Sequence, residues 1–119
     1  DNPIADRAAE FGAPESAVLD AVLVCVGRFG LAKTTLDDIA REINPMVRGW
    51  IAYYGRYTRS ALYPLARYIN QTLAVWMKRK YKRFHRRLGR ARLFLEKIAR
   101  ENRRLFVHWQ IGDGGALAL

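Results

Sequence analysis

The sequence lacks acidic side chains over its middle: no Asp or Glu lies between Glu42 and Glu96, whereas thirteen Lys and Arg do. A charge field of one sign needs a counter-charge from outside the chain, and a nucleic-acid backbone is the commonest one. Residues 1–35 carry five acids and three bases, and residues 36–119 carry six acids and eighteen bases, so the net charge of +10 arises in the second part. We therefore expect the partner-binding surface there.

Cysteine and histidine are scarce, which excludes most catalytic and metal-binding classes. Cys25 is the one cysteine, so an internal disulfide is excluded and a reducing, cytoplasmic location is expected. Its apolar neighbours are typical of a buried, inert thiol. His85 and His108 are the only histidines, with no Cys or carboxylate at metal-ligand spacing. Nothing supports a Cys25–His nucleophile pair, and no Gly-rich phosphate loop is present, so we expect no catalytic residue, metal or cofactor.

Long apolar runs are also missing. The longest, from Ala21 to Val26, is far too short to span a bilayer, and the first thirteen residues lack the apolar core of a signal peptide. We expect no membrane partner. Binding to a membrane surface through a basic amphipathic helix over 61–87 is an alternative, but the apolar stripe of that helix is needed for a core. The first residue is not Met, which suggests a fragment or a trimmed chain.

Apolar periodicity predicts an all-α fold: a small bundle of about four helices with a basic face and a loosely ordered N-terminal arm. A nearly continuous apolar run over 16–28 favours a helix, although a buried strand has the same pattern. Thr35 and Asp38 form a capping-box-like start, and Asn44-Pro45 marks a second helix start, with Asn44 as its N-cap. Residues 61–84 carry a strong amphipathic stripe, made of Leu62, Leu65, Ile69, Leu73 and Trp76.

Gly89 is expected to break the helical pattern before a last helix over 90–104, which should bury Leu93, Phe94 and Ile98. The apolar and aromatic segment 105–109 should then dock back on the bundle. We divide the chain into an N-terminal segment (1–35), a domain (36–112) and a frayed tail (113–119).

A strongly basic stretch runs from Lys78 to Arg92, where nine of fifteen residues are Lys or Arg. On a helix, Arg79 and Arg83, and likewise Arg83 and Arg87, would be like-charged neighbours, each pair destabilising by about 0.2–0.5 kcal/mol. A solvated basic face usually interleaves Glu with Lys, so its absence favours a polyanion partner. Tyr81 and Phe84 within the stretch either stack on unpaired bases or extend the core stripe, and core burial is favoured.

The segment 43–57 contains Asn44-Pro45, Arg48-Gly49-Trp50 and Tyr53-Tyr54. Gly49 inside a helix costs about 1 kcal/mol relative to Ala, which is usually offset by close approach of a backbone, a helix or a phosphate. Trp50 should bury its ring, and at least one tyrosine should reach solvent or RNA. Taken singly, each of these residues fits ordinary helix packing.

In that order, these residues resemble the maturase-specific domain (domain X, or thumb) of group II intron-encoded reverse transcriptases. Downstream, the segments 60–64, 76–84 and 105–112 are also similar, so the resemblance covers roughly 36–112. It implies binding of structured group II intron RNA and assistance of its folding and splicing, normally as the C-terminal part of a reverse transcriptase. We take as framework residues Asn44, Pro45, Gly49, Trp50, Tyr53 and Tyr54, and as phosphate contacts Arg48, Arg56, Arg59, Lys78, Arg79, Lys82, Arg83, Arg86 and Arg87.

Residues 1–35 do not match what precedes this domain in the family. No paired-aspartate polymerase motif is present, since Asp37-Asp38 opens a helix, and no His- and Cys-rich endonuclease module is present either. We therefore expect no enzyme activity from this chain. A separate reverse-transcriptase chain and target DNA remain candidate partners. Two alternatives stay open: a non-specific DNA- or RNA-binding helical module, and a truncated, non-functional remnant of a mobile element.

Overall fold

The structure is a computed structural model that describes residues 14–57, 60 and 62–110. Its α-helices are α2 (Pro14–Phe29), α3 (Leu36–Tyr57), α4 (Leu62–Lys80) and α5 (Leu88–Glu101), and two 3-10 turns are η2 (Lys82–Phe84) and η3 (Val107–Gln110). The described residues contain no strand. The expected all-α bundle of about four helices is confirmed, whereas the expected N-terminal arm and most of the tail lie outside the described residues.

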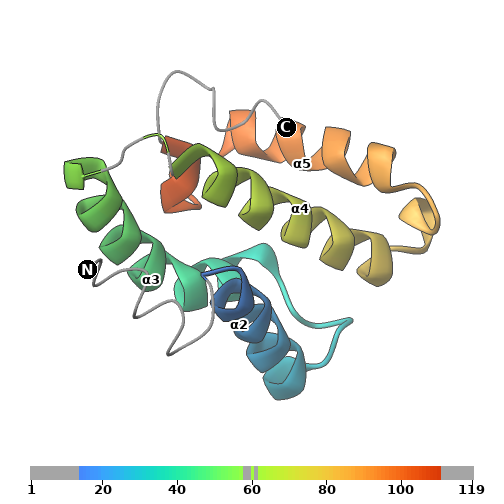
Figure 1. Cartoon of the computed structure of the whole chain (residues 1–119). Coiled ribbons are helices and arrows are strands. Elements are labelled where there is room, and N and C mark those ends of the chain that lie inside the picture. Colours follow the sequence, from blue (N-terminus) through green and yellow to red (C-terminus); the bar gives the residue numbers. More distant parts are fainter. Residues whose placement is uncertain (1–13, 58–59, 61, 111–119) are drawn as a thin grey trace.

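Helix α4 is the centre of the bundle. It contacts α2, α3 and α5, and Figure 1 shows α5 running back along it after the tight connection through η2. The expected stripe of α4 is confirmed, because all five of its apolar residues are buried. Four of them, all but Leu62, pack against Val18 and Cys25 of α2, Ile43 of α3 and Leu95 of α5 in one hydrophobic cluster, and Leu62 belongs to a second, smaller cluster with Ala66. Most of the folding free energy therefore comes from apolar surface that these helices bury together.

Helix α2 covers the run that could have been helix or strand, which settles it as a helix. Pro14 occupies its first turn, where a missing N–H costs nothing. Gly30 follows its last residue with a φ of 83°, and the Gly30 N–H donates to the Val26 carbonyl over 2.8 Å. A left-handed residue at this place ends a helix, and glycine adopts it without steric cost.

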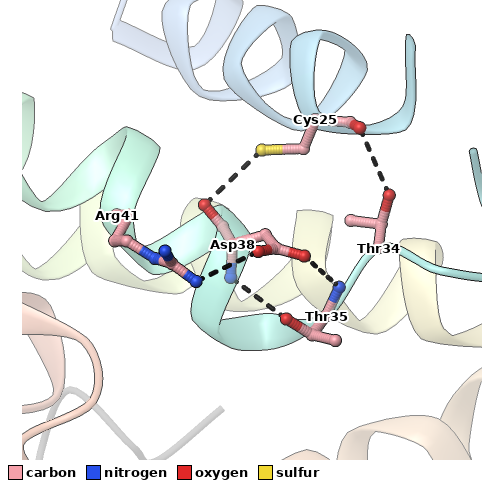
Figure 2. Close-up of polar contacts among 5 residues, drawn as sticks. All are labelled: Cys25, Thr34, Thr35, Asp38 and Arg41. Carbon is pink, nitrogen blue, oxygen red and sulfur yellow. Dashed lines mark hydrogen bonds and ion pairs between the residues drawn. The ribbon is translucent and has the colours of Figure 1, made fainter. Parts of the chain in front are cut away.

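A reciprocal capping box starts α3 and ties it to α2 (Figure 2). The Thr35 N–H donates to Asp38 Oδ2 over 3.0 Å, and the Asp38 N–H donates to Thr35 Oγ1 over 3.2 Å. Thr34 Oγ1 shares its one proton between the carbonyls of Gly30, at 2.6 Å, and Cys25, at 3.3 Å. Cys25 Sγ donates to the Asp38 carbonyl, as Figure 2 shows. The capping-box prediction is confirmed, and the 30–35 connection is held at both ends.

Helix α3 continues through Asn44-Pro45, so the predicted second start at that pair is wrong. A proline inside a helix removes one backbone hydrogen bond and costs about 3 kcal/mol. Two features offset that cost. Pro45 and Arg41, whose carbonyl loses its usual donor, are both exposed to water, and one buried face runs through Ile39, Ile43 and Val47 without interruption. Packing of that face keeps the helix whole.

Three expectations for α4 and α5 are also wrong. Helix α4 ends at Lys80 rather than near Phe84, and α5 starts at Leu88, so Gly89 lies inside its first turn instead of breaking it. Leu93 is 65% exposed rather than buried, because Ala91, Leu95 and Ala99 form the inner face of α5. Phe94 and Ile98 are half-buried at the edge of the core.

The segment after α5 returns to the bundle as expected. Phe106, His108 and Trp109 are fully buried, and η3 contacts α3. Asn44 fixes this return: its Nδ2 donates to the Leu105 carbonyl and its Oδ1 accepts from the Val107 N–H, both over 3.0 Å. Asn44 therefore holds segment 105–107 against α3 and does not act as an N-cap.

Candidate nucleic-acid interface

The connection between α4 and α5 gathers six of the predicted phosphate contacts, which we call the basic turn: Lys78, Arg79, Lys82, Arg83, Arg86 and Arg87. Consecutive tight hydrogen bonds hold it, from the Phe84 N–H to the Tyr81 carbonyl and from the Arg87 N–H to the Phe84 carbonyl. All six side chains are exposed except that of Lys78, which is half-buried. The structure thus brings together residues that the sequence spreads over ten positions.

The aromatic rings of Tyr81 and Phe84 join the basic turn to the hydrophobic core. Phe84 is buried, and Tyr81 packs against the core at its edge, which confirms the interpretation that these rings extend the core. Their rings meet edge to face with centroids 6.0 Å apart, and Phe84 lies 5.4 Å from Phe94 of α5. Such pairs contribute roughly 0.5–1.5 kcal/mol beyond their buried area. The turn is therefore a fixed platform whose cations stand outward.

No carboxylate neutralises this platform within the part of the chain that the structure describes. There, the one ion pair joins Arg41 to Asp38 over 3.2 Å, on α3. The first turn of α5 also has no acidic residue, and its N-cap, Arg87, makes no side-chain capping bond. Cations at a helix N-terminus oppose the helix dipole. An anion at this place would relieve both sources of repulsion.

The exposed side of α5 continues the basic surface, which the sequence reasoning missed. Arg90, Lys97 and Arg100 are exposed at spacings of seven and three, so they lie along one face, and Arg103 and Arg104 follow the helix end. The helical spacing of these basic residues predicts a basic face, but Glu96 and Glu101 on the same helix make that pattern less evident in the sequence. This face is less one-sided in charge than the basic turn.

The remaining predicted contacts lie on a second surface, on α3. Arg48 and Arg56 are exposed two turns apart on that helix, with exposed Ala52 between them, and Tyr53 beside them is also exposed. Figure 1 shows the end of α3 and the α4–α5 connection at opposite ends of the molecule. The structure therefore does not bring Arg56 together with the basic turn, and Arg59 lies outside the described residues.

Comparison with protein families identifies the domain. Residues 30–94 match the family described as group II intron, maturase-specific domain, which is more than half of the 119 residues. The chain belongs to this family. No curated protein and no solved structure matches it significantly. The match includes both the motif on α3 and the whole basic turn.

Three of the six motif residues of this maturase-specific domain pack against the fold, namely Asn44, Trp50 and Tyr54, and the other three are exposed. Trp50 is half-buried against the core, and Tyr54 packs beside Leu62 and Ala66 in a small second cluster, with its ring 6.0 Å from that of Tyr53. No described backbone or helix offsets the cost of Gly49, because a Cβ built there meets no atom within 4 Å beyond its own helix backbone and chain neighbours. Of the expected offsets, a phosphate stays a prediction. Among the described residues, nothing in the fold itself requires glycine at this position.

The C-terminal segment of the maturase-specific domain contains a buried polar cluster. Asn70 Oδ1 accepts from Trp109 Nε1 over 2.8 Å and lies 2.7 Å from His108 Nε2. A carbonyl oxygen only accepts, so His108 carries its proton on Nε2. Burial lowers the pKa of His108 to about 3. His108 is thus a neutral, packed histidine.

Catalytic chemistry finds no support in the described part of the domain. Cys25 is buried, and burial, followed by the charges of Glu42 and Asp38, raises the pKa of its thiol. A thiol kept protonated is a poor nucleophile. The described residues contain no group of three His, Cys, Asp or Glu placed to hold a metal ion, and no helix among them is long and apolar enough to cross a membrane.

Proposed function

We propose that this maturase-specific domain binds structured group II intron RNA through the basic turn and thereby assists folding and splicing of the intron. The observation that supports the proposal is a cluster of six cations, five of them exposed, without a carboxylate partner in the described chain. Residues 36–112 are the proposed RNA-binding domain. In this role, the domain would act with a reverse transcriptase, either as its C-terminal part or beside a polymerase on a separate chain.

The proposed contribution of the protein is electrostatic and geometric. Folding a large intron brings phosphates of distant strands close together, and cations placed between them reduce the repulsion. The basic turn supplies these charges on a backbone held by tight hydrogen bonds, so little backbone freedom is lost on binding. The intron RNA itself carries out the splicing chemistry in this proposal. The α3 surface, with Arg48 and Arg56, is proposed as a second contact.

Binding of a group II intron transcript, titrated against salt and against duplex DNA, tests the proposal. Replacing Arg79, Arg83 and Arg87 by Ala should weaken binding and reduce the slope of log K against log salt by about 0.7–0.9 for each phosphate that the variant no longer neutralises. A matched control removes the same charge elsewhere, at the exposed residues Arg28, Lys33 and Arg67. The control should keep most of the affinity and nearly the full slope.

Each outcome has a distinct meaning. Binding that survives excess duplex DNA and depends on the basic turn supports the maturase role and leads to a splicing assay with the same variants. Binding that DNA abolishes equally well reduces the domain to a general polyanion binder. Equally weakened binding in the two triple variants would show that net charge alone matters and that the basic turn does not touch the RNA. Absence of binding would contradict the proposal and favour a non-functional remnant.

A further inference from the structure

Arg83 differs from the other cations of the basic turn because aromatic rings hold its guanidinium group. Its Cζ lies 4.7 Å from the ring centre of Phe84, 4.6 Å from that of Phe94 and 5.6 Å from that of Tyr81. Arginine stacks on ring faces while its N–H donors keep their fixed, planar arrangement. No hydrogen bond or ion pair from a described residue uses these donors, and the side chain is exposed.

Arg86 is unusual in its backbone. It has a φ of 58° and is the one residue other than glycine with a positive φ in the described chain. Long side chains rarely adopt this conformation, whereas glycine does so freely. The Arg86 side chain is exposed and makes no ion pair within the described ranges. The fold alone would be served better by glycine, so the use of this side chain lies outside the fold.

We propose that Arg83 and Arg86 are the two anchoring residues of the interface, each gripping a phosphodiester of the RNA backbone through paired N–H bonds. This inference rests on the proposed function and sharpens it: the other cations of the basic turn supply charge, whereas these two supply direction. A planar guanidinium matches two oxygens of one phosphate, and a lysine ammonium does not. The stacked rings fix Arg83 before RNA arrives, so its binding loses little conformational entropy.

Lys80 is a second cation over these aromatic rings, and it differs from Arg83 in its hydrogen bonding. Its ammonium also lies over rings, 5.3 Å from Trp76 and 5.5 Å from Tyr81, but it donates to the Thr34 carbonyl. That lysine therefore joins the 30–35 connection to α4 and belongs to the framework. Of the cations stacked on this aromatic group, Arg83 is the one whose donors face no described acceptor.

The test uses variants that keep charge or relieve backbone strain. Arg83→Lys keeps the net charge and loses the planar donors, and Arg86→Gly removes the side chain while suiting a φ of 58°. We expect Arg83→Lys to bind the intron transcript more weakly at every salt concentration. We expect Arg86→Gly to melt at the same or a higher temperature than the parent and yet to bind about tenfold more weakly. Opposite movement of stability and affinity is a result that a structural role would not give.

Arg28→Lys is the matched control, because Arg28 also lies over a phenylalanine ring, at 5.9 Å from Phe29, on α2. It should change neither melting temperature nor affinity. If the parent chain binds intron RNA and both variants bind as tightly as it does, the anchoring inference is wrong while the proposed function stands. If Arg86→Gly lowers the melting temperature, the side chain serves the fold, which also overturns the inference. If the parent chain does not bind RNA at all, both fail together.

Discussion

His108 couples the stability of the domain to pH. In the folded chain it stays neutral because burial lowers its pKa to about 3, whereas in the unfolded chain it titrates near the ordinary value of 6.5. Between these two values, the unfolded state binds more protons than the folded state. The free energy of unfolding therefore falls as pH decreases from 6.5 toward 3, by about 1.4 kcal/mol for each pH unit.

Unfolding by urea, measured at several pH values between 7 and 5, tests this coupling. His108 should cost the parent chain about 2 kcal/mol over that range, and His108→Gln should remove this part of the pH dependence. The range lies above the titration of Asp38, whose pKa is held below its usual value chiefly by the Thr35 N–H. His85→Gln is the control for the substitution itself, since His85 is exposed and lies away from the buried cluster of His108. Equal slopes in all three proteins would contradict the assignment.

Helix α3 shows how an element can carry residues that its own packing does not need. Its inner face is continuous from Ile39 to Val47 and beyond, which explains why Pro45 does not end it. Its outer face holds Gly49, where an added Cβ would meet no described atom within 4 Å. Gly49 therefore lowers the stability of the helix, and no contact within the described fold compensates for this loss.

Gly49→Ala should raise the free energy of unfolding by about 1 kcal/mol, since Ala restricts the unfolded chain and favours helix. Chemical denaturation followed by circular dichroism measures the change. Gly55→Ala is the control: it is equally open but near the helix end, so its increase in stability should be smaller. A lower stability of Gly49→Ala would reveal a close neighbour of this position. If RNA approaches α3 here, the stabilised variant should also bind it less tightly.

Most elements could be predicted from the sequence, because the stripe of α4, the capping box at Thr35 and the docking of segment 105–109 depend on local spacing and hydrophobicity. The continuity of α3 could not, since helix-breaking signals at Asn44-Pro45 were overridden by packing that spans the whole molecule. At the candidate site, composition predicted the cations as a group, and their contact with RNA stays a prediction. Composition could not show that Arg83 is stacked, because Phe94, one of the rings beneath it, lies on another helix. It could not show the positive φ of Arg86 either.

Across the whole molecule, the two candidate contact surfaces are separated. The basic turn and the end of α3 lie at opposite ends of a domain whose longest extent is 47 Å. Charges this far apart in water interact weakly, because the Debye length is only about 8 Å at physiological salt. The surfaces should therefore act independently on a long RNA, and a short RNA can reach only one of them.

Independence predicts additive effects. The decreases in binding free energy caused by Arg48→Ala with Arg56→Ala, and by Lys82→Ala with Arg87→Ala, should sum in the fourfold variant within about 0.5 kcal/mol, as measured by equilibrium binding to the full intron transcript. A short RNA hairpin should respond to one pair only. If neither RNA responds to Arg48 and Arg56, the α3 surface does not bind RNA; a strongly non-additive result would mean that the surfaces act through a shared change in the protein.

The hydrogen bonds of Asn44 set an order in which this domain can fold during its synthesis. Its amide sits in the middle of α3, but the partners that satisfy it are 61 and 63 residues further along the chain. During synthesis, α3 emerges from the ribosome long before those residues exist, and its amide can meet only water until Leu105 and Val107 arrive. Closure of the bundle therefore waits for the synthesis of Leu105 and Val107, so a chain on a ribosome stalled within α5 lacks both partners of the Asn44 amide.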